Sequence, residues 1–160
     1  MTQHASRRRR RLFTVIALFI PILFFAVVEG GLRVLGFGED YPLFVPFAAA
    51  PGYLQPNPDV VNRYFADPEQ APAVSIDTQF FLAEKAANGL RLFVQGGSTA
   101  AGFPYGNNAS PAGLLRKRLQ LSFPNQQVEV ISTAMAAVNS YTLLDFADEI
   151  IAQQPDAVLI

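Results

Sequence analysis

The sequence predicts an α/β protein in which one transmembrane helix precedes a parallel sheet of alternating strands and helices. Two observations predict this class: an uncharged apolar run over 12–28, and a strand, helix, strand, helix, strand order over 90–160. A chain of 160 residues, 51% of them hydrophobic, can form one globular domain at most. The expected parts are a basic tail (1–11), a membrane helix (12–32), a spacer (33–75) and an α/β domain (76–160).

The apolar run is long enough to cross a bilayer once. It extends without a charge from Leu12 to Val28 and can continue to Leu32, a span of about 31 Å against a hydrocarbon core of roughly 30 Å. The run Arg7 to Arg11 lies directly before it, so the positive-inside rule places the N-terminus in the cytoplasm and the domain outside, in the periplasm or extracellular space. The alternative is a cleaved signal peptide. Because no small-x-small site follows Val28 closely, we expect an uncleaved single-pass anchor in the cytoplasmic (inner) membrane.

Charge and composition exclude several classes of function. Beyond Val28 there are seven basic and thirteen acidic residues, a net charge of about −6 (7 − 13), which does not suit binding to nucleic-acid phosphates. The chain has no cysteine and one histidine, so the sequence predicts neither disulfides nor a metal site, and no cofactor motif is present. Asp145, Asp148 and Glu149 have the spacing of a solvated helix face.

The segment from about Gly36 to Val74 is rich in proline and aromatic residues. Seven prolines exclude long helices and central strands, which predicts an extended spacer. Disordered tethers are poor in aromatic residues. We therefore expect this segment to lie against the domain or the membrane surface.

The remaining pattern is that of a parallel sheet. Short apolar runs predict strands over 90–95, 128–132 and 157–160, and helical spacing predicts helices over 111–123 and 142–154. Ser110 followed by Pro111 is an N-cap followed by proline at the first helical position, and Thr142 with Asp145 has a spacing like that of a capping box. Alternating strands and helices indicate right-handed crossovers, with ligands at the carboxyl ends of the strands.

The first strand leads directly into Gln95-Gly96-Gly97-Ser98-Thr99-Ala100-Ala101-Gly102-Phe103. A phosphate-binding loop would use such glycines, but the P-loop spacing and G-x-G-x-x-G are both absent. A purely structural turn is a second interpretation. In the third, Ser98 is a nucleophile whose own N–H forms part of an oxyanion hole for acyl transfer.

Two blocks of this region resemble the SGNH (GDSL-like) hydrolase family. Gly96-Gly97-Ser98-Thr99, followed by Gly102, is similar to the first block, and the loop from Ser132 to Tyr141 is similar to the second. Ala137 aligns with a glycine that supplies a second oxyanion N–H in that family, and we expect Asn139 to order the turn into the next helix. The resemblance covers Leu90 to Ile160 and implies the first β-α-β-α-β units of a flavodoxin-like sheet.

The resemblance also implies groups that this sequence does not contain. The family's base is a histidine three residues after an aspartate, and a Gly-x-Asn block follows the strand that here covers 157–160. The single histidine, His4, precedes the arginine run and is expected on the cytoplasmic side. We therefore expect the 160 residues to be an N-terminal fragment that is inactive by itself.

Two functions remain open. The resemblance implies a membrane-anchored serine ester hydrolase acting outside the cytoplasm on an ester-bearing small molecule, lipid or glycan, with Ser98 as nucleophile and the N–H groups of Ser98 and Ala137 holding the oxyanion. The alternative is a non-catalytic envelope protein that uses the same fold for glycan binding or assembly. Ala134 and Ala137 favour the alternative, whereas Gly96-Gly97-Ser98-Thr99 and Gly102 favour the enzyme.

Overall fold

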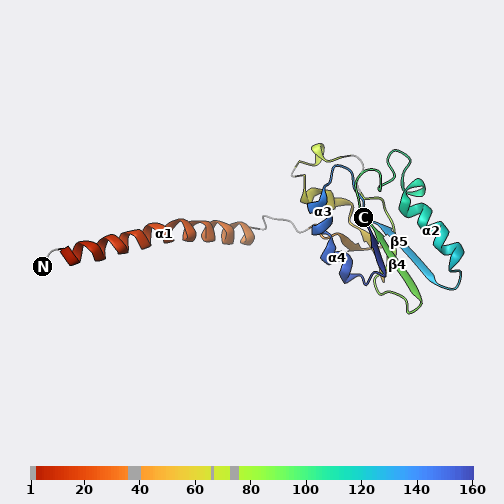
Figure 1. Cartoon of the computed structure of the whole chain (residues 1–160), viewed down its shortest axis with the longest axis horizontal. Helices are drawn as coiled ribbons and strands as arrows, with labels where there is room; N and C mark the ends of the chain where they lie inside the picture. Colours follow the sequence, from red (N-terminus) through yellow and green to blue (C-terminus); the bar gives the residue numbers. More distant parts are fainter. Residues whose placement is uncertain (1–2, 36–40, 66, 73–75) are drawn as a thin grey trace. The chain divides into compact units, whose positions relative to one another are not determined.

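The computed structural model describes residues 3–35, 41–65, 67–72 and 76–160. The chain divides into two compact units, Met1–Asp40 and Tyr41–Ile160. Figure 1 shows a single helix in the first unit and a mixed α/β arrangement in the second.

Helix α1 (Gln3–Val34) contains the predicted membrane segment. Its apolar span, Leu12–Val34, has 23 residues, about 34 Å at 1.5 Å per residue, and is long and apolar enough to cross a membrane. Pro21 lies within the helix. Near the end of the span, Arg33 donates to Glu29 one turn earlier at 2.7 Å, so the two charges in this apolar stretch neutralise each other.

The second unit is built on a three-stranded parallel sheet with the strand order β5-β4-β6. The strands are β4 (Gly89–Val94), β5 (Gln127–Ser132) and β6 (Ala157–Leu159), as the apolar runs predict. Of these three strands, β4 comes first in the chain and is central in the sheet. Its carboxyl end meets those of both neighbours, because Thr133 N donates to Val94 O at 2.9 Å and Gln95 N donates to Leu159 O at 2.8 Å.

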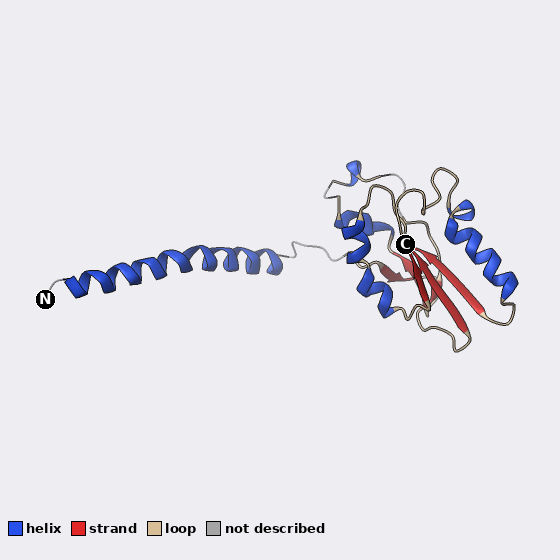
Figure 2. Cartoon of the chain, in the orientation of Figure 1, coloured by secondary structure: helices blue, strands red, loops and turns tan. Residues whose placement is uncertain are grey.

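Helices cover both faces of this sheet (Figure 2). Helix α2 (Pro111–Ser122) packs against one face through Ala112, which is fully buried against Leu92 and Val130. On the other face, Phe93 and Ile131 pack against Phe146 and Ile150, from the region of α3 (Ser140–Asp145) and α4 (Ala147–Ala152). Alternate side chains of β4 and β5 thus enter two separate apolar clusters.

The predicted helix over 142–154 is instead two short helices that meet at Phe146. Backbone bonds bridge the junction, from Phe146 N to Thr142 O at 3.1 Å and from Ile150 N to Phe146 O at 3.0 Å. The capping prediction at Thr142 is wrong, because the helix begins earlier. Asn139 is the N-cap and accepts a hydrogen bond from Tyr141 N at 2.9 Å.

Residues 41–72, predicted as part of the spacer, belong to the compact unit. They contain short strands β1 (Phe44–Pro46) and β2 (Tyr53–Pro56), which form an antiparallel sheet with β3 (Phe81–Leu82), and the 3-10 helices η1 (Pro58–Arg63) and η2 (Pro68–Gln70). Leu43, Val60 and Val61 enter the core beside Phe93. The segment lies against the domain, as its aromatic content predicts; its positions 36–40, 66 and 73–75 lie outside the described residues.

One buried ion pair joins several of these elements. Arg91 of β4 is 1% exposed and donates to Glu129 of β5 at 2.7 Å. Its other nitrogens donate to Gln153 O at 2.9 Å and Leu82 O at 2.7 Å, and its guanidinium lies 5.1 Å from the Phe81 ring centroid. A single side chain therefore connects the parallel sheet, the antiparallel sheet and the end of α4.

Replacing Ser110 by alanine is expected to lower the free energy of unfolding by about 1 kcal/mol. The Ser110 hydroxyl oxygen accepts from Gly113 N at 3.1 Å and the hydroxyl donates to Asn107 O at 2.6 Å, so alanine would leave a buried helix N–H unpaired. Urea unfolding of the full chain in detergent micelles, followed by tyrosine near-ultraviolet circular dichroism, measures this. Ser122→Ala, at the exposed end of the same helix, is the control, and equal effects of the two changes would refute the capping role.

Candidate active site

Ser98 lies in an exposed turn directly after the central strand β4. The turn is closed by its own backbone, since Phe103 N donates to Ser98 O at 3.0 Å and Gly102 N donates to Thr99 O at 3.1 Å. Among the described residues, none hydrogen-bonds to the Ser98 hydroxyl or accepts from its N–H. The hydroxyl is thus open to solvent at the edge where α/β sheets bind ligands.

Two glycines give this turn its shape. Gly96 has φ 147° and Gly102 has φ 85°, a region that L side chains rarely adopt. A Cβ at Gly102 would lie 2.5 Å from Gly106 O, and one at Gly96 would lie 2.6 Å from the Ala100 Cβ. Gly97 has open space around it and no positive φ, so the need for glycine rests on the other two positions.

The second predicted block lies beside this turn. Met135 N donates to Gly96 O at 3.0 Å, which joins the loop after β5 to the loop after β4. Two residues later, Ala137 is exposed and has φ 57°, the left-handed conformation that glycine adopts most readily. No acceptor for the Ala137 N–H is present in the described part of the chain. Alanine therefore holds a glycine-like backbone at position 137.

A hollow of about 670 Å³ borders the Ala137 loop. Ala137 and Asn139 form one side of it, and Arg63, Tyr64 and Phe65, from the segment predicted as a spacer, form another; Ser98 is not among its lining residues. Sequence reasoning assigned these three residues no role near the site. The aromatic content of that segment was the available signal, because it indicated packing against the domain.

Asp145 and Glu149 do not form a merely solvated helix face. Arg63 donates to Asp145 at 3.0 Å and to Glu149 at 2.5 Å, and Leu43 N donates to the other Glu149 oxygen at 2.6 Å. Tyr64 donates its hydroxyl to Asp145 at 2.5 Å. The hydrogen bond from Tyr64, followed by those from Arg63, lowers the pKa of Asp145, while burial is the main cause that raises the pKa of Tyr64. These contacts fix α3, whose N-cap is Asn139, against residues 41–64.

The depressed pKa of Asp145 predicts an acid-sensitive contribution to stability. A carboxylate whose pKa is lower folded than unfolded stabilises the fold above its unfolded pKa, and this contribution is lost as pH falls through the folded pKa. Since the Asp145 side chain is 50% exposed, screening limits the effect to below about 1 kcal/mol. The urea midpoint of Asp145→Asn should fall less steeply below about pH 4 than that of the unmodified chain. Asp148→Asn, an exposed neighbour, should keep the original slope; identical slopes in all three proteins would contradict the assignment.

The described residues around Ser98 include no histidine to act as a base, because the single histidine of the sequence, His4, belongs to α1. The sheet thus brings Ser98 and Ala137 to adjoining loops, and the sequence of residues 41–160 contains no histidine. Comparison with family models, with curated proteins and with solved structures finds no match to this chain.

Proposed function

We propose that this protein is a membrane-anchored serine ester hydrolase in which Ser98 is the nucleophile. The observation that carries the proposal is the juxtaposition of two loops at the carboxyl ends of β4 and β5, joined by the hydrogen bond from Met135 N to Gly96 O. One loop offers an exposed serine, and the other offers Ala137 with a glycine-like φ of 57° and an N–H without an acceptor among the described residues.

These groups suit acyl transfer. The Ser98 oxygen would attack an ester carbonyl, and the N–H groups of Ser98 and Ala137 would donate to the oxygen that becomes negative. The strand order supports the same interpretation, since β5-β4-β6 is second, first, third in chain order, as at the beginning of a flavodoxin-like sheet. In such sheets the switch point lies between the first and third strands, here β4 and β6, and Ser98 follows β4.

The reaction also needs a base to accept the serine proton. The proposal therefore requires a histidine from outside residues 41–160, and resemblance to the SGNH hydrolases predicts Gly-x-Asn and Asp-x-x-His in coding sequence after Ile160. With α1 as an anchor whose arginine-rich end is cytoplasmic, the site would act on esters outside the cytoplasm.

A fluorophosphonate probe tests the proposal, because an activated serine oxygen displaces fluoride from phosphorus and remains labelled. The protein that includes the base should gain one label per chain, on the peptide containing Ser98, as read by mass spectrometry. Failure to label Ser98 in a protein that carries Asp-x-x-His would overturn the nucleophile assignment, as would equal labelling of Ser98→Ala.

A non-catalytic binding role is the second candidate. The observation that favours it is the hollow of about 670 Å³, which is lined by Tyr64, Phe65 and Tyr141 and does not include Ser98. Absence of both Gly-x-Asn and Asp-x-x-His from the coding sequence, together with no labelling of Ser98, would favour this role over the hydrolase.

A further inference from the structure

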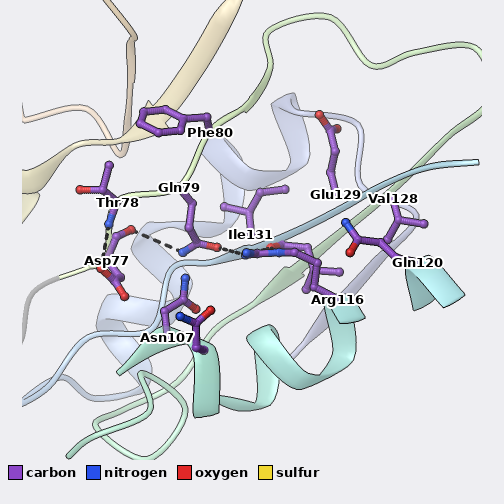
Figure 3. A pocket seen from close by; sticks show the side chains of 12 residues that line it. Asp77, Thr78, Gln79, Phe80, Asn107, Arg116, Gln120, Val128, Glu129 and Ile131 are labelled. Atoms are coloured by element: carbon purple, nitrogen blue, oxygen red, sulfur yellow. Dashed lines mark hydrogen bonds between the residues drawn. The ribbon is translucent and has the colours of Figure 1, made fainter. Parts of the chain in front are cut away.

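A groove of about 500 Å³ runs beside the outer edge of β5, away from the candidate active site. Figure 3 shows its lining: β5 residues from Val128 to Ile131, residues 77–80 on one side, and Arg116 and Gln120 of α2 on the other. β5 is an edge strand of the described sheet, so one side of its backbone pairs with β4 and the other faces this groove.

The direction of the β5 amides follows from the bonds at its two ends. Gln127 N donates to Asn88 O at 3.3 Å and Thr133 N donates to Val94 O at 2.9 Å, so odd-numbered amides point toward β4. Ser132 N points the other way and donates to Gln79 Oε1 at 3.1 Å. By the alternation of a strand, the N–H groups of Val128 and Val130 also face the groove.

Gln79 already pairs with this edge as a neighbouring strand would. Its side-chain amide accepts from Ser132 N and donates to Ser132 O at 3.3 Å, and the residue is 6% exposed. The two bonds to one residue reproduce the donor and acceptor pattern of an added strand. Unlike the Ser132 amide, the N–H groups of Val128 and Val130 have no acceptor among the described residues.

Arg116 supplies a cation at the same place. It donates to Val130 O at 2.6 Å and to Gln79 Oε1 at 2.6 Å through Nη2, while Nη1 has no partner within the described residues. Of the acids that line the groove, Glu129 is committed to Arg91, and Asp77 attracts Arg116 from the opposite side without a direct bond. The donors facing the groove therefore include two backbone N–H groups and one guanidinium nitrogen.

We infer that this groove binds an extended peptide segment carrying acidic side chains, which adds to β5 as a further strand. Its carbonyl oxygens accept from Val128 N and Val130 N, its own N–H donates to Val128 O, and a carboxylate accepts from Arg116 Nη1. Residues 77–80 and α2 flank the edge, which suits a single strand better than the edge of a second sheet. The inference does not depend on the proposed hydrolase function.

Amide hydrogen exchange of the full chain in detergent micelles tests this, with the probe acetyl-Glu-Val-Glu-Val-Glu-amide. Because glutamate and valine alternate along the probe, a shift in register by two residues presents the same side chains to the groove. Saturating probe should slow exchange of the Val128 and Val130 amides at least about tenfold, as expected when an open amide becomes hydrogen-bonded. Arg116→Ala should weaken binding by about tenfold, whereas Arg118→Ala, which removes the same charge from an exposed position outside the groove, should not.

A second probe separates strand addition from simple attraction of charges. The same peptide with all five backbone nitrogens of its residues methylated keeps every carboxylate but carries methyl groups along both edges, so neither edge can pair with a strand. It is used on the unmodified chain, so no variant has to fold. The methylated probe should leave the exchange rates of the Val128 and Val130 amides unchanged. Equal binding of the methylated probe, or unchanged exchange at Val128 and Val130 with the first probe, would overturn the inference.

Discussion

Replacing Ser98 by alanine is expected to reduce the hydrolysis of p-nitrophenyl acetate at least about a thousandfold, since removal of a serine nucleophile eliminates the acyl-enzyme route. Alanine removes one oxygen from an exposed turn whose backbone bonds, from Phe103 N and Gly102 N, remain in place. The loss should therefore appear in kcat without unfolding. The measurement is a steady-state rate for the protein that contains the catalytic base.

Ser122→Ala is the matched control, because it makes the same change at an exposed serine at the end of α2 and should leave the rate unchanged. Retention of more than a tenth of the activity in Ser98→Ala would remove Ser98 from the reaction. The 160-residue chain itself, whose one histidine is His4, should not turn over the ester.

Replacing Arg91 by methionine is expected to cost about 3–5 kcal/mol of folding free energy, as breaking a buried ion pair does. Methionine has a similar length but leaves the Glu129 carboxylate, whose side chain is 9% exposed, without its cation. It also leaves Leu82 O and Gln153 O without their side-chain donor. Since domains are stable by roughly 5–15 kcal/mol, this single change removes a large fraction of the stability of the second unit.

Urea unfolding of the full chain in detergent micelles measures the loss. Lys85→Met is the matched control: Lys85 also binds a carboxylate, Asp156 at 2.6 Å, but Asp156 is 41% exposed, so the cost should be below about 1 kcal/mol. The double change Arg91→Met with Glu129→Leu should recover part of the loss, because no unpaired charge then remains buried. Equal costs for Arg91→Met and Lys85→Met would show that the buried pair contributes little.

The parallel strands and α2 were predictable because their signals are local. β4, β5 and β6 are short and largely apolar runs, and α2 begins where Ser110 and Pro111 place a cap and a first helical residue. The turn at Ser98 was predictable for the same reason, since a strand runs directly into two glycines. Its place at the end of the sheet follows from the order of the elements rather than from any distant contact.

Other features depend on partners far apart in the chain. In the sequence, Arg91 is an isolated charge within an otherwise apolar strand. Its partner Glu129 is 38 residues away, so no local pattern indicates the ion pair. Arg63 and Asp145 are 82 residues apart, so no local sequence pattern indicates that the proline-rich segment is hydrogen-bonded to α3. Proline content correctly excluded a long helix from the described residues of 41–72. Its exclusion of central strands was wrong, because the short strand β2 lies between β1 and β3, and it gave no sign that Leu43 and Val60 enter the core.

The left-handed backbone at Ala137 bears on how such a loop tolerates amino-acid exchange. A methyl group there costs about 1–2 kcal/mol of strain in the folded chain. Glycine would remove the strain but give the unfolded chain more freedom, which costs about 0.4–1 kcal/mol. The second cost offsets about half of the first, so alanine in place of glycine here costs only about 1 kcal/mol, which a folded domain can tolerate while the N–H keeps its direction. A search pattern written around an obligatory glycine would pass over a loop whose backbone has the same form.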